Sequence, residues 1–404
     1  MSVASSPRST ASPLWEHGAV NATAPQVSIR QLAGYFLRLG ALGFGGPIAL
    51  AGYMQRDLVE RRGWFTQEEY LQGLAVAQTL PGPLAAQLAM WLGYVRLGTA
   101  GATASALAFI LPPFVIVTIV AAIYVSLAGT TMIQALFYGI GPTVIVLILR
   151  GAWKLLRVTV KADRRLWAIF AVVAVATFVV RSEVAILFIA AGLAGVLMYA
   201  PRYRRWARSV PLLLPPGMAP VLAAAGAADP ATLLALGIFF FKAGAFTFGS
   251  GLAIVPFLQQ GVVHDFGWLT EREFLDAVAM GMITPGPVVI TAVFVGYLVA
   301  GFAGAVVAAV GVFLPPFLMV VLFAPWIVRH RAHPAVQGFT KGATAAAAGA
   351  IVGAGAVIAT QVLIDVPRLV IFAGAFVILW RWKVSEPLVV AASAVIGLVL
   401  LSLG

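Results

Sequence analysis

Long apolar runs dominate the chain from residue 29 onward and alternate with short polar segments. Examples are the runs at 106–128, 143–149, 168–180 and 305–327. A helix needs about 20 mostly apolar residues to cross the hydrocarbon core of a bilayer. The chain of 404 residues therefore holds material for about ten spanning helices. The pattern predicts an all-α integral membrane protein.

The pattern repeats itself within the chain. Residues 36–83 align with residues 240–287 without a gap at a constant offset of 204, and after one deleted residue the match resumes at an offset of 203. The alignment places one Pro-Gly-Pro segment, at 81–83, on another at 285–287. Such self-similarity is the mark of a duplicated structural unit. We therefore expect two homologous halves.

Composition shifts mark the boundaries of these halves. Residues 1–28 are rich in Ser, Ala, Pro and Thr and lack the apolar core of a secretory signal, so they read as a disordered tail. We assign residues 29–200 to the first repeat, residues 201–231 to a basic linker and residues 232–404 to the second repeat.

Within each half the pattern predicts one long helix (29–54 and 232–257), a polar loop, a broken apolar segment and four further spans. The apolar pieces that flank Pro-Gly-Pro are about 11 and 15 residues long, and at a rise of about 1.5 Å per residue neither crosses about 30 Å of hydrocarbon. Each broken segment should therefore be a re-entrant hairpin or a discontinuous helix.

Loop charges give the relative orientation of the halves. The segment 150–165 holds six basic residues against one acid, whereas its counterpart near 360–368 holds only Asp365 and Arg368. Conversely, 126–131 is uncharged, while its counterpart carries a basic cluster at 329–331. Basic loops stay in the cytoplasm, so the opposite biases indicate two repeats with inverted topology. Five spans plus one hairpin per half would produce this inversion.

The number of spans stays open at one place. The segment 212–225 contains Pro215 and Pro216. If it crosses the membrane, and if the broken segments cross fully, ten spans plus two hairpins become thirteen spans. The sequence does not place the N-terminus on either side.

Composition and charge exclude several classes of protein. The hydrophobic fraction is 61% and charged residues make up 10%, against about 25% in soluble domains. The net charge is +12, but the basic residues sit at the ends of apolar runs, as the positive-inside rule expects of a membrane protein, so nucleic acid is not an expected partner. There are no cysteines, and no motif of a metalloprotease, a nucleotide hydrolase or a serine hydrolase is present. We expect no enzyme activity, no cofactor and no metal.

Two cations lie at equivalent positions of the repeats, Arg38 and Lys242. Lys242 is ten residues into its apolar run, about 15 Å from the start of the helix and close to the bilayer centre. A cation there costs several kcal/mol and usually faces a cavity or a partner. We expect the two to contribute positive potential to an anion site, Lys242 more strongly than Arg38. The alternative is that they snorkel to an interface.

The Pro-Gly-Pro segments add a second source of positive potential. A proline suits the first position of a helix, so the amides of residues 84–86 and 288–290 should lack partners within their helices. Such amides, with the positive end of the helix dipole, favour an anion. The alternative is a plain packing kink. The residues we assign here to substrate binding are Gln78, Pro81, Gly82, Pro83, Leu84, Gln87, Thr284, Pro285, Gly286, Pro287, Val288 and Thr291.

Glycines interrupt the first helix of each half, at 43–46 and 249–251. They should break or loosen it near the middle of the membrane. Exposed backbone donors and close helix packing explain them equally well. The candidate binding residues of this segment are Gly45, Gly46, Gly249, Ser250 and Gly251.

Two capping boxes open the helix before each Pro-Gly-Pro segment, Thr66 with Glu69 and Thr270 with Glu273. A structural role is the simpler interpretation. Glu69, Glu273 and Asp276 are also candidate proton carriers, on their placement alone.

These residues together resemble the chromate ion transporters in their long, two-domain form. The resemblance covers nearly everything from residue 32 onward. It rests on the second-half copies and on Phe44, Gly45, Gly46, Pro47, Met54, Gly63, Trp64, Glu69, Pro81, Gly82, Pro83, Gly93 and Tyr94. The second half departs from the pattern, because Ser250 and Gly251 stand where the first half has Gly46 and Pro47. The two halves could therefore contribute unequally to a site.

The resemblance implies a secondary transporter that exports chromate across the bacterial inner membrane, confers chromate resistance and draws on the proton motive force. Sulfate is a tetrahedral dianion of similar size, and a site of amides and cations would separate the two poorly. The rival classes are an oxyanion channel, a sulfate transporter without proton coupling and a membrane enzyme. The expected partners are a chromate or sulfate oxyanion, the lipid bilayer and a second copy of the chain in a homodimer.

The inverted topology predicts that the basic segments at 150–165 and 329–331 face the same side of the membrane. Single cysteines at Lys161→Cys and Arg331→Cys can be introduced into a chain that has none. A membrane-impermeant thiol reagent should label both from the cytoplasmic side. Labelling from opposite sides would contradict the inverted arrangement.

Overall fold

The computed structural model describes residues 27–44, 46–127, 130–160, 163–180, 185–200, 229–247, 251, 254–330, 333–382 and 384–402. These residues form helices joined by short connections, with no strand among them, which confirms the all-α prediction. Most of the predicted tail and linker, with the segment 212–225, lies outside the described residues, as do Gly45, Gly249 and Ser250.

The elements of the two halves follow the same order. The first half contains α1 (Ile29–Leu42), α2 (Gly46–Met54), η1 (Gln55–Arg61), α3 (Gln67–Thr79), α4 (Leu84–Ser126), α5 (Thr131–Thr159), α6 (Arg164–Val180) and α7 (Ala185–Tyr199). The second contains α8 (Pro230–Phe246), α9 (Ile254–Leu258), η3 (Gln259–Asp265), α10 (Glu271–Ile283), η4 (Val288–Ile290), α11 (Thr291–His330), α12 (Pro334–Val362), α13 (Val366–Arg381) and α14 (Glu386–Ser402). Glycines in left-handed conformation recur at equivalent positions, with φ of 59° at Gly63 and 61° at Gly267. The duplication therefore extends to backbone detail.

The prediction of one long helix at the start of each half is wrong. Helix α1 ends at Leu42, and α2 with η1 runs back beside it, so that the guanidinium of Arg62 lies 5.5 Å from the ring centre of Tyr35. In the second half Phe257 stacks on Phe239 with the ring centres 5.1 Å apart. The predicted glycine break is confirmed: the chain turns where Gly46 adopts a φ of 75°, which glycine tolerates. Each first helix is thus a hairpin, and its halves cannot be counted as one span.

The break at each Pro-Gly-Pro segment is confirmed. Helix α3 ends at Thr79 and α4 begins at Leu84, and α4 bends sharply at Leu97 and Gly98, where Gly98 has a φ of 62°. The second half repeats the bend at Ala300 and Gly301. The helical pieces on either side of each break are therefore shorter than the roughly 20 residues of a spanning helix.

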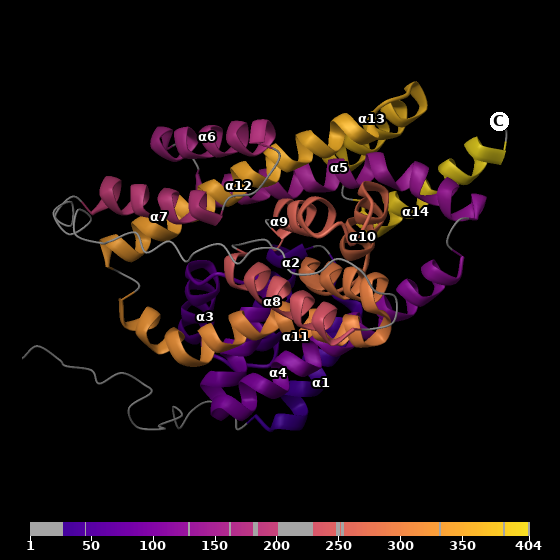
Figure 1. Ribbon diagram of the computed structural model, residues 1–404. Helices are drawn as coiled ribbons and strands as arrows, with labels where there is room; N and C mark the ends of the chain where they lie inside the picture. The colour runs from indigo at the N-terminus through magenta and orange to yellow at the C-terminus, as the bar shows by residue number, and fades with distance from the viewer. Residues whose placement is uncertain are drawn as a thin grey trace, which may run out of the picture.

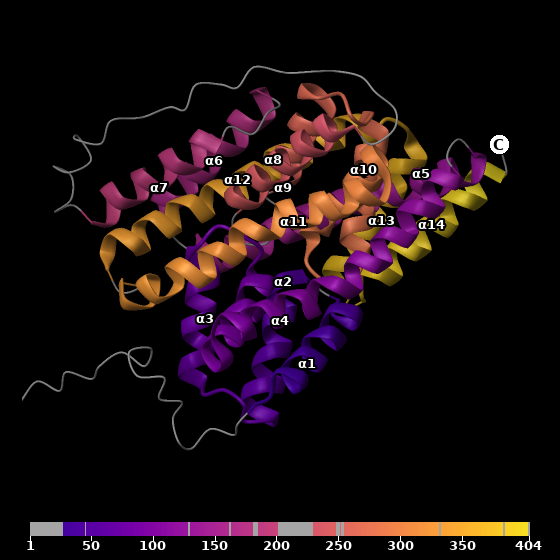
Figure 2. The same ribbon diagram turned by 60° about the horizontal axis from the view of Figure 1, so that its bottom comes forward.

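The two halves exchange their last helices. In Figure 1 α1, α3, α4, α8 and α11 lie in the lower part of the view, α5–α7 and α12–α14 lie in the upper part, and α9 and α10 lie between them, with α10 beside α5. In the upper part α12 of the second half packs against α6 and α7 of the first, while α5 packs against α13 and α14 (Figure 2). The equivalent helices α5 and α12 also pack on each other, as do α4 and α11. Each half therefore completes the other.

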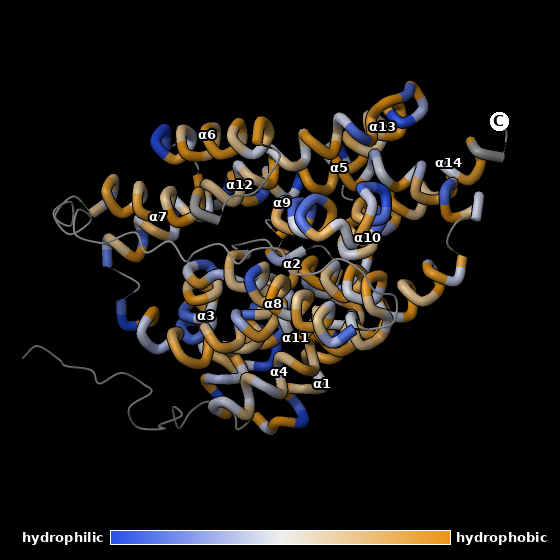
Figure 3. The backbone as a smooth tube through the Cα atoms, viewed as in Figure 1, coloured by the Kyte–Doolittle hydropathy of each residue, from blue (hydrophilic) through white to orange (hydrophobic). Residues whose placement is uncertain are grey.

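Four helices are long and apolar enough to cross a membrane: Leu84–Ser126, Thr131–Arg157, Val288–His330 and Pro334–Val362. Figure 3 shows that hydrophobic residues cover most of the other helices too, and three shorter apolar helices occur at Leu187–Tyr199, Pro230–Phe246 and Glu386–Leu400. The chain is a multi-pass membrane protein, and the total of ten spans stays a prediction. The basic segment 150–165 is mainly the end of α5 rather than a loop, because α5 continues to Thr159.

Candidate functional site

The chain breaks of the two halves meet at the centre of the molecule. The amide of Gly82 donates a hydrogen bond to the carbonyl of Thr247, and the amide of Gly286 donates to the carbonyl of Gly43 at 3.1 Å. Both carbonyls stand just after a helix end, where no partner within the helix remains. Each Pro-Gly-Pro tip therefore binds the broken first helix of the other half.

Both tip glycines have backbone angles that other residues rarely adopt, with φ of 140° at Gly82 and 98° at Gly286. A Cβ at Gly82 would also lie 2.6 Å from Cβ of Pro316, and one at Gly286 would lie 2.9 Å from Cγ of Pro113. These prolines belong to double-proline segments inside α11 and α4, again in the opposite half. The tips fit against them only because they carry no side chain.

The helix starts after the two tips differ. No side chain caps α4 at Pro83, so the first amides of α4 have no cap among the described residues. In the second half the amide of Ile290 donates to the carbonyl of Pro287 at 3.0 Å, within a short 3-10 turn. The expectation that all amides of 288–290 are free is therefore wrong for Ile290, because the chain tightens there before α11 begins.

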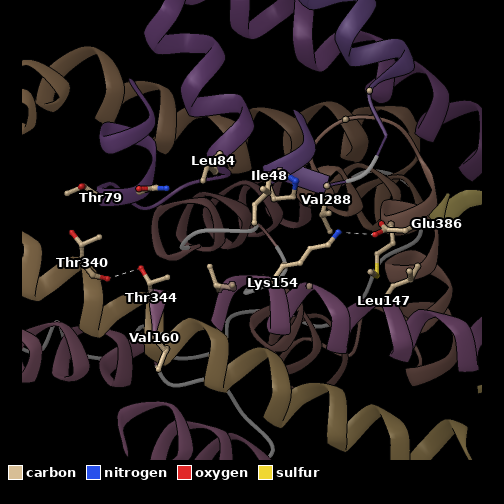
Figure 4. Close-up of a pocket in the computed structure, with 18 of the residues that line it drawn as sticks. Ile48, Thr79, Leu84, Leu147, Lys154, Val160, Val288, Thr340, Thr344 and Glu386 are labelled. Carbon is tan, nitrogen blue, oxygen red and sulfur yellow. Dashed lines mark hydrogen bonds and ion pairs between the residues drawn. The ribbon is translucent and has the colours of Figure 1, made fainter. Parts of the chain in front are cut away.

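A cavity of about 560 Å³ opens beside the tips, and we call it the main cavity. Its walls come from α2, α3, the start of α4, α5, the end of α10, α12 and the start of α14, so both halves contribute (Figure 4). Six residues predicted to bind substrate line it: Gly46, Gln78, Leu84, Thr284, Gly286 and Val288.

Charged side chains line the cavity opposite the tips. Lys154 Nζ lies 3.2 Å from Glu386 Oε1, which also lies 3.3 Å from Nη1 of Arg150; Figure 4 shows Lys154 reaching toward Glu386. Glu386 therefore forms ion pairs with both Lys154 and Arg150.

Lys341 differs from Lys154 because no carboxylate neutralises it among the described residues. Its Nζ lies 4.7 Å from the ring centre of Tyr199. The hydroxyl of Tyr199 donates to Asp163, and this bond, followed by the one from the amide of Arg165, lowers the pKa of Asp163. Asp163 therefore stays ionised near neutral pH, and it accepts these hydrogen bonds without forming an ion pair with Lys341. Lys341 is the cation of this cavity that is best placed to meet an anion.

Sequence reasoning missed Lys341, Lys154 and Glu386. Arg38 and Lys242 stand out in the sequence because a cation recurs at the same position of both repeats. Lys341 does not stand out in this way, because it aligns with Tyr138 in the first half. Lys154 was counted among loop charges, although it lies on α5. The only available signal was that Lys341 interrupts a helix rich in Gly, Ala and Thr.

The remaining predicted binding residues lie around the tips rather than on the cavity wall. Gln87 is fully buried, and its Nε2 donates to the carbonyl of Pro81 at 2.8 Å. Thr291 is also fully buried and donates to the carbonyl of Val288 at 2.9 Å. These two side chains therefore hydrogen-bond to backbone carbonyls at or beside the tips. The others of this group are Pro81, Gly82, Pro83, Gly251, Pro285 and Pro287.

Arg38 and Lys242 do not line the main cavity. Both are exposed, and Arg38 borders a separate cavity of about 500 Å³ together with Arg30, Arg61 and Arg62. Lys242 lies on an exposed face of α8. Their role in substrate binding stays a prediction, and the structure does not bring them together with the hairpin tips.

The three candidate proton carriers have different surroundings. Both capping boxes are confirmed. Glu69 also forms a buried ion pair with Arg96, whose Nη1 lies 2.6 Å from Glu69 Oε1, which favours a structural role. Glu273 is partly exposed. Asp276 is only 3% exposed and accepts a hydrogen bond of 2.7 Å from the hydroxyl of Tyr124. Proton transport by any of them stays a prediction.

Comparison with known proteins identifies relatives along nearly the whole chain. The model of the family described as "Chromate transporter" matches residues 30–196 and again residues 234–398, which supports two homologous halves. The "Chromate transport protein" of Cupriavidus metallidurans is 49% identical over 93% of this chain and 94% of its own length. The "Probable chromate transport protein" of Synechococcus elongatus is 47% identical over 93% of this chain and 96% of its own. The "Chromate transport protein" of Pseudomonas aeruginosa is 32% identical over 93% of both chains. No solved structure matches the chain.

The tip geometry predicts that Gly82→Ala and Gly286→Ala each weaken oxyanion binding. An added methyl group meets a proline of the opposite half and strains the backbone, which shifts the neighbouring amides. Loss of one well-placed donor should weaken binding about five-fold to over a hundred-fold. The measurement is the chromate affinity of the purified, folded variants. Gly52→Ala is the matched control, because a Cβ there meets nothing within 4 Å. Parental affinity in both tip variants would remove the tips from the site.

Proposed function

The chain belongs to the chromate transporter family, and we propose that it is a secondary transporter that exports chromate across the bacterial inner membrane. The observation that carries the proposal is the main cavity, which is lined by Leu84 just after the first-half tip, by Gly286 of the second-half tip and by Lys341, a cation with no ion pair among the described residues. Chromate is a tetrahedral dianion. It needs donors from several directions, and the uncapped start of α4 and the ammonium of Lys341 provide two of them.

The position of the cavity supports loading from the cytoplasm. It touches α5 toward its C-terminal end and α12 toward its N-terminal end. By loop charge, these are the ends that should face the cytoplasm. The equivalent helices α5 and α12 thus pass each other in opposite directions, as inverted repeats require. We therefore propose that the structure is open toward the cytoplasm and that the halves are inserted with opposite orientation.

The membrane potential favours export of a dianion without any further coupling. Each charge that leaves a negative interior gains about 2.3 kcal/mol at 100 mV. We propose that the proton motive force drives export through this potential, with coupled proton movement as an additional source of energy. A channel would exploit the same potential, so energetics alone do not separate the two classes. Saturation and dependence on the pH gradient do.

Lys341→Gln should weaken chromate transport at low substrate concentration, because it removes the charge and keeps most of the side-chain volume. A hydrogen bond to a charged group contributes about 1.5–3 kcal/mol, so the half-saturating chromate concentration should rise about ten-fold to over a hundred-fold. The measurement is the initial rate of radiolabelled chromate flux in vesicles that contain equal amounts of folded protein.

Lys242→Gln is the matched comparison, because it removes the same charge from α8 outside the main cavity. The proposal expects a half-saturating concentration close to that of the parent. If Lys242→Gln loses transport while Lys341→Gln retains it, the cation site lies on α8, where the apolar pattern of the sequence placed it, and the proposal for the main cavity fails.

The class of transporter is tested with the parent protein in the same vesicles. Chromate flux should saturate and should respond to an imposed pH gradient at a fixed membrane potential, and sulfate should compete with chromate because the two dianions have the same shape and charge. Flux that rises linearly with chromate and ignores the pH gradient would support a channel. Flux of sulfate without chromate would support the sulfate-transporter alternative.

A further inference from the structure

A second cavity, of about 390 Å³, lies at the other end of the α5 and α12 pair. It touches α5 near its start, at residues 134–141, and α12 at its end, at residues 361–362. The main cavity touches the opposite ends of the same two helices. The two cavities therefore lie toward opposite ends of one helix pair.

The internal repeat relates the walls of the two cavities. Five of the twelve residues that line the second cavity have repeat equivalents that line the main cavity, where α3 takes the place of α10. The equivalent pairs are Gln134 with Gln337, Phe137 with Thr340, Tyr138 with Lys341, Gly141 with Thr344, and Ala279 with Ala75. The second cavity is thus the repeat-related copy of the main cavity.

A hydrogen bond between the halves borders the second cavity, since Asp276 lines it. The hydroxyl of Tyr124, at the end of α4, donates to Oδ2 of Asp276 on α10 at 2.7 Å. The ring of Tyr124 packs edge-on against Phe137 and Phe294, with ring centres 5.7 Å and 5.3 Å apart. Tyr124 is 9% exposed and Asp276 is 3% exposed. The bond is therefore shielded from water.

The main cavity has no equivalent closure. The repeat places Ile327 where the first half has Tyr124 and places Gln72 where the second half has Asp276. An isoleucine cannot form that hydrogen bond, and the side-chain amide of Gln72 donates to Glu68 on its own helix instead. The hydrogen bond between Tyr124 and Asp276 beside the second cavity therefore has no counterpart between Ile327 and Gln72 beside the main cavity.

We propose that the second cavity is the exit vestibule for the transported oxyanion and that the contact between Tyr124 and Asp276 is its gate. This rests on the proposed function, in which the main cavity loads from the cytoplasm. Release follows when the gate opens and the second cavity takes the open form of the main one. Arg272 and Arg368 line the vestibule together with Glu271 and Asp276. Arg368 pairs with Asp365 at 3.3 Å, so Arg272 is the cation that the vestibule offers to an anion.

The first test locates the two entrances with the equivalent pair Gln134→Cys and Gln337→Cys. Each is placed alone in the otherwise unchanged full chain, which contains no cysteine, and is exposed to a membrane-impermeant maleimide from either side of sealed vesicles. The proposal expects Gln337→Cys to react from the cytoplasmic side and Gln134→Cys from the opposite side. Reaction of both from one side would overturn it.

The second test measures the gate with the deeper equivalent pair Ala279→Cys and Ala75→Cys. In the parent background Ala279→Cys should react more slowly than Ala75→Cys. Adding Tyr124→Phe removes the hydrogen bond to Asp276 and should raise the reaction rate of Ala279→Cys about ten-fold, while the rate of Ala75→Cys falls. Asp276→Asn should act in the same direction.

An unchanged rate at Ala279→Cys in both gate variants would overturn the proposal. So would a rise at Ala279→Cys and Ala75→Cys together, because general loosening of the fold would explain it. None of these measurements uses chromate. If the gate behaves as expected but chromate flux is absent, the cargo assignment fails and the vestibule stands.

Discussion

The two Pro-Gly-Pro tips and the ends of α1 and α8 are buried at Gly82, Gly286, Gly43 and Thr247, and the backbone groups that are free there must find partners. An unpaired amide or carbonyl in an apolar environment costs several kcal/mol. The structure meets this requirement across the halves, through the bonds from Gly82 to Thr247 and from Gly286 to Gly43. Neither bond can form within one half alone. The position of the hairpin tips, and with them the main cavity, depends on this exchange.

The same exchange explains how two similar halves produce an asymmetric site. Equivalent walls surround both cavities, but Lys341 faces the main cavity where Tyr138 faces the second one. The hydroxyl of Tyr138 donates to Asp365, and the guanidinium of Arg368 lies over the ring of Tyr138. The side chain of Tyr138 is therefore held by two contacts. Because the main cavity has the cation Lys341 where the second cavity has the neutral Tyr138, an anion should prefer the main cavity in this conformation. The duplication accounts for the similar walls of the two cavities, and the residues that differ between the repeats make the two cavities unequal.

Much of this architecture could be predicted from sequence, because it follows from local rules. The duplication, the Pro-Gly-Pro breaks and both capping boxes have short-range signals, and six predicted residues do line the main cavity. The reversal after α1 could not be predicted, because glycines at 43–46 are compatible with a bend in one helix as well as with a return. The pair Lys154 and Glu386 joins positions 232 residues apart, and no pattern along the chain connects them. Lys242 was favoured by its depth in an apolar run, but depth does not tell which way a side chain faces.

The central claim is that the oxyanion binds in the main cavity, between the hairpin tips and Lys341. Crystals of the protein grown with chromate would locate it directly, because chromium gives an anomalous signal that sulfur and solvent do not match near its absorption edge. We expect a chromium peak in the main cavity, close to Lys341 and the start of α4 at Leu84. A peak beside Lys242 or Arg38, with none in the main cavity, would contradict it.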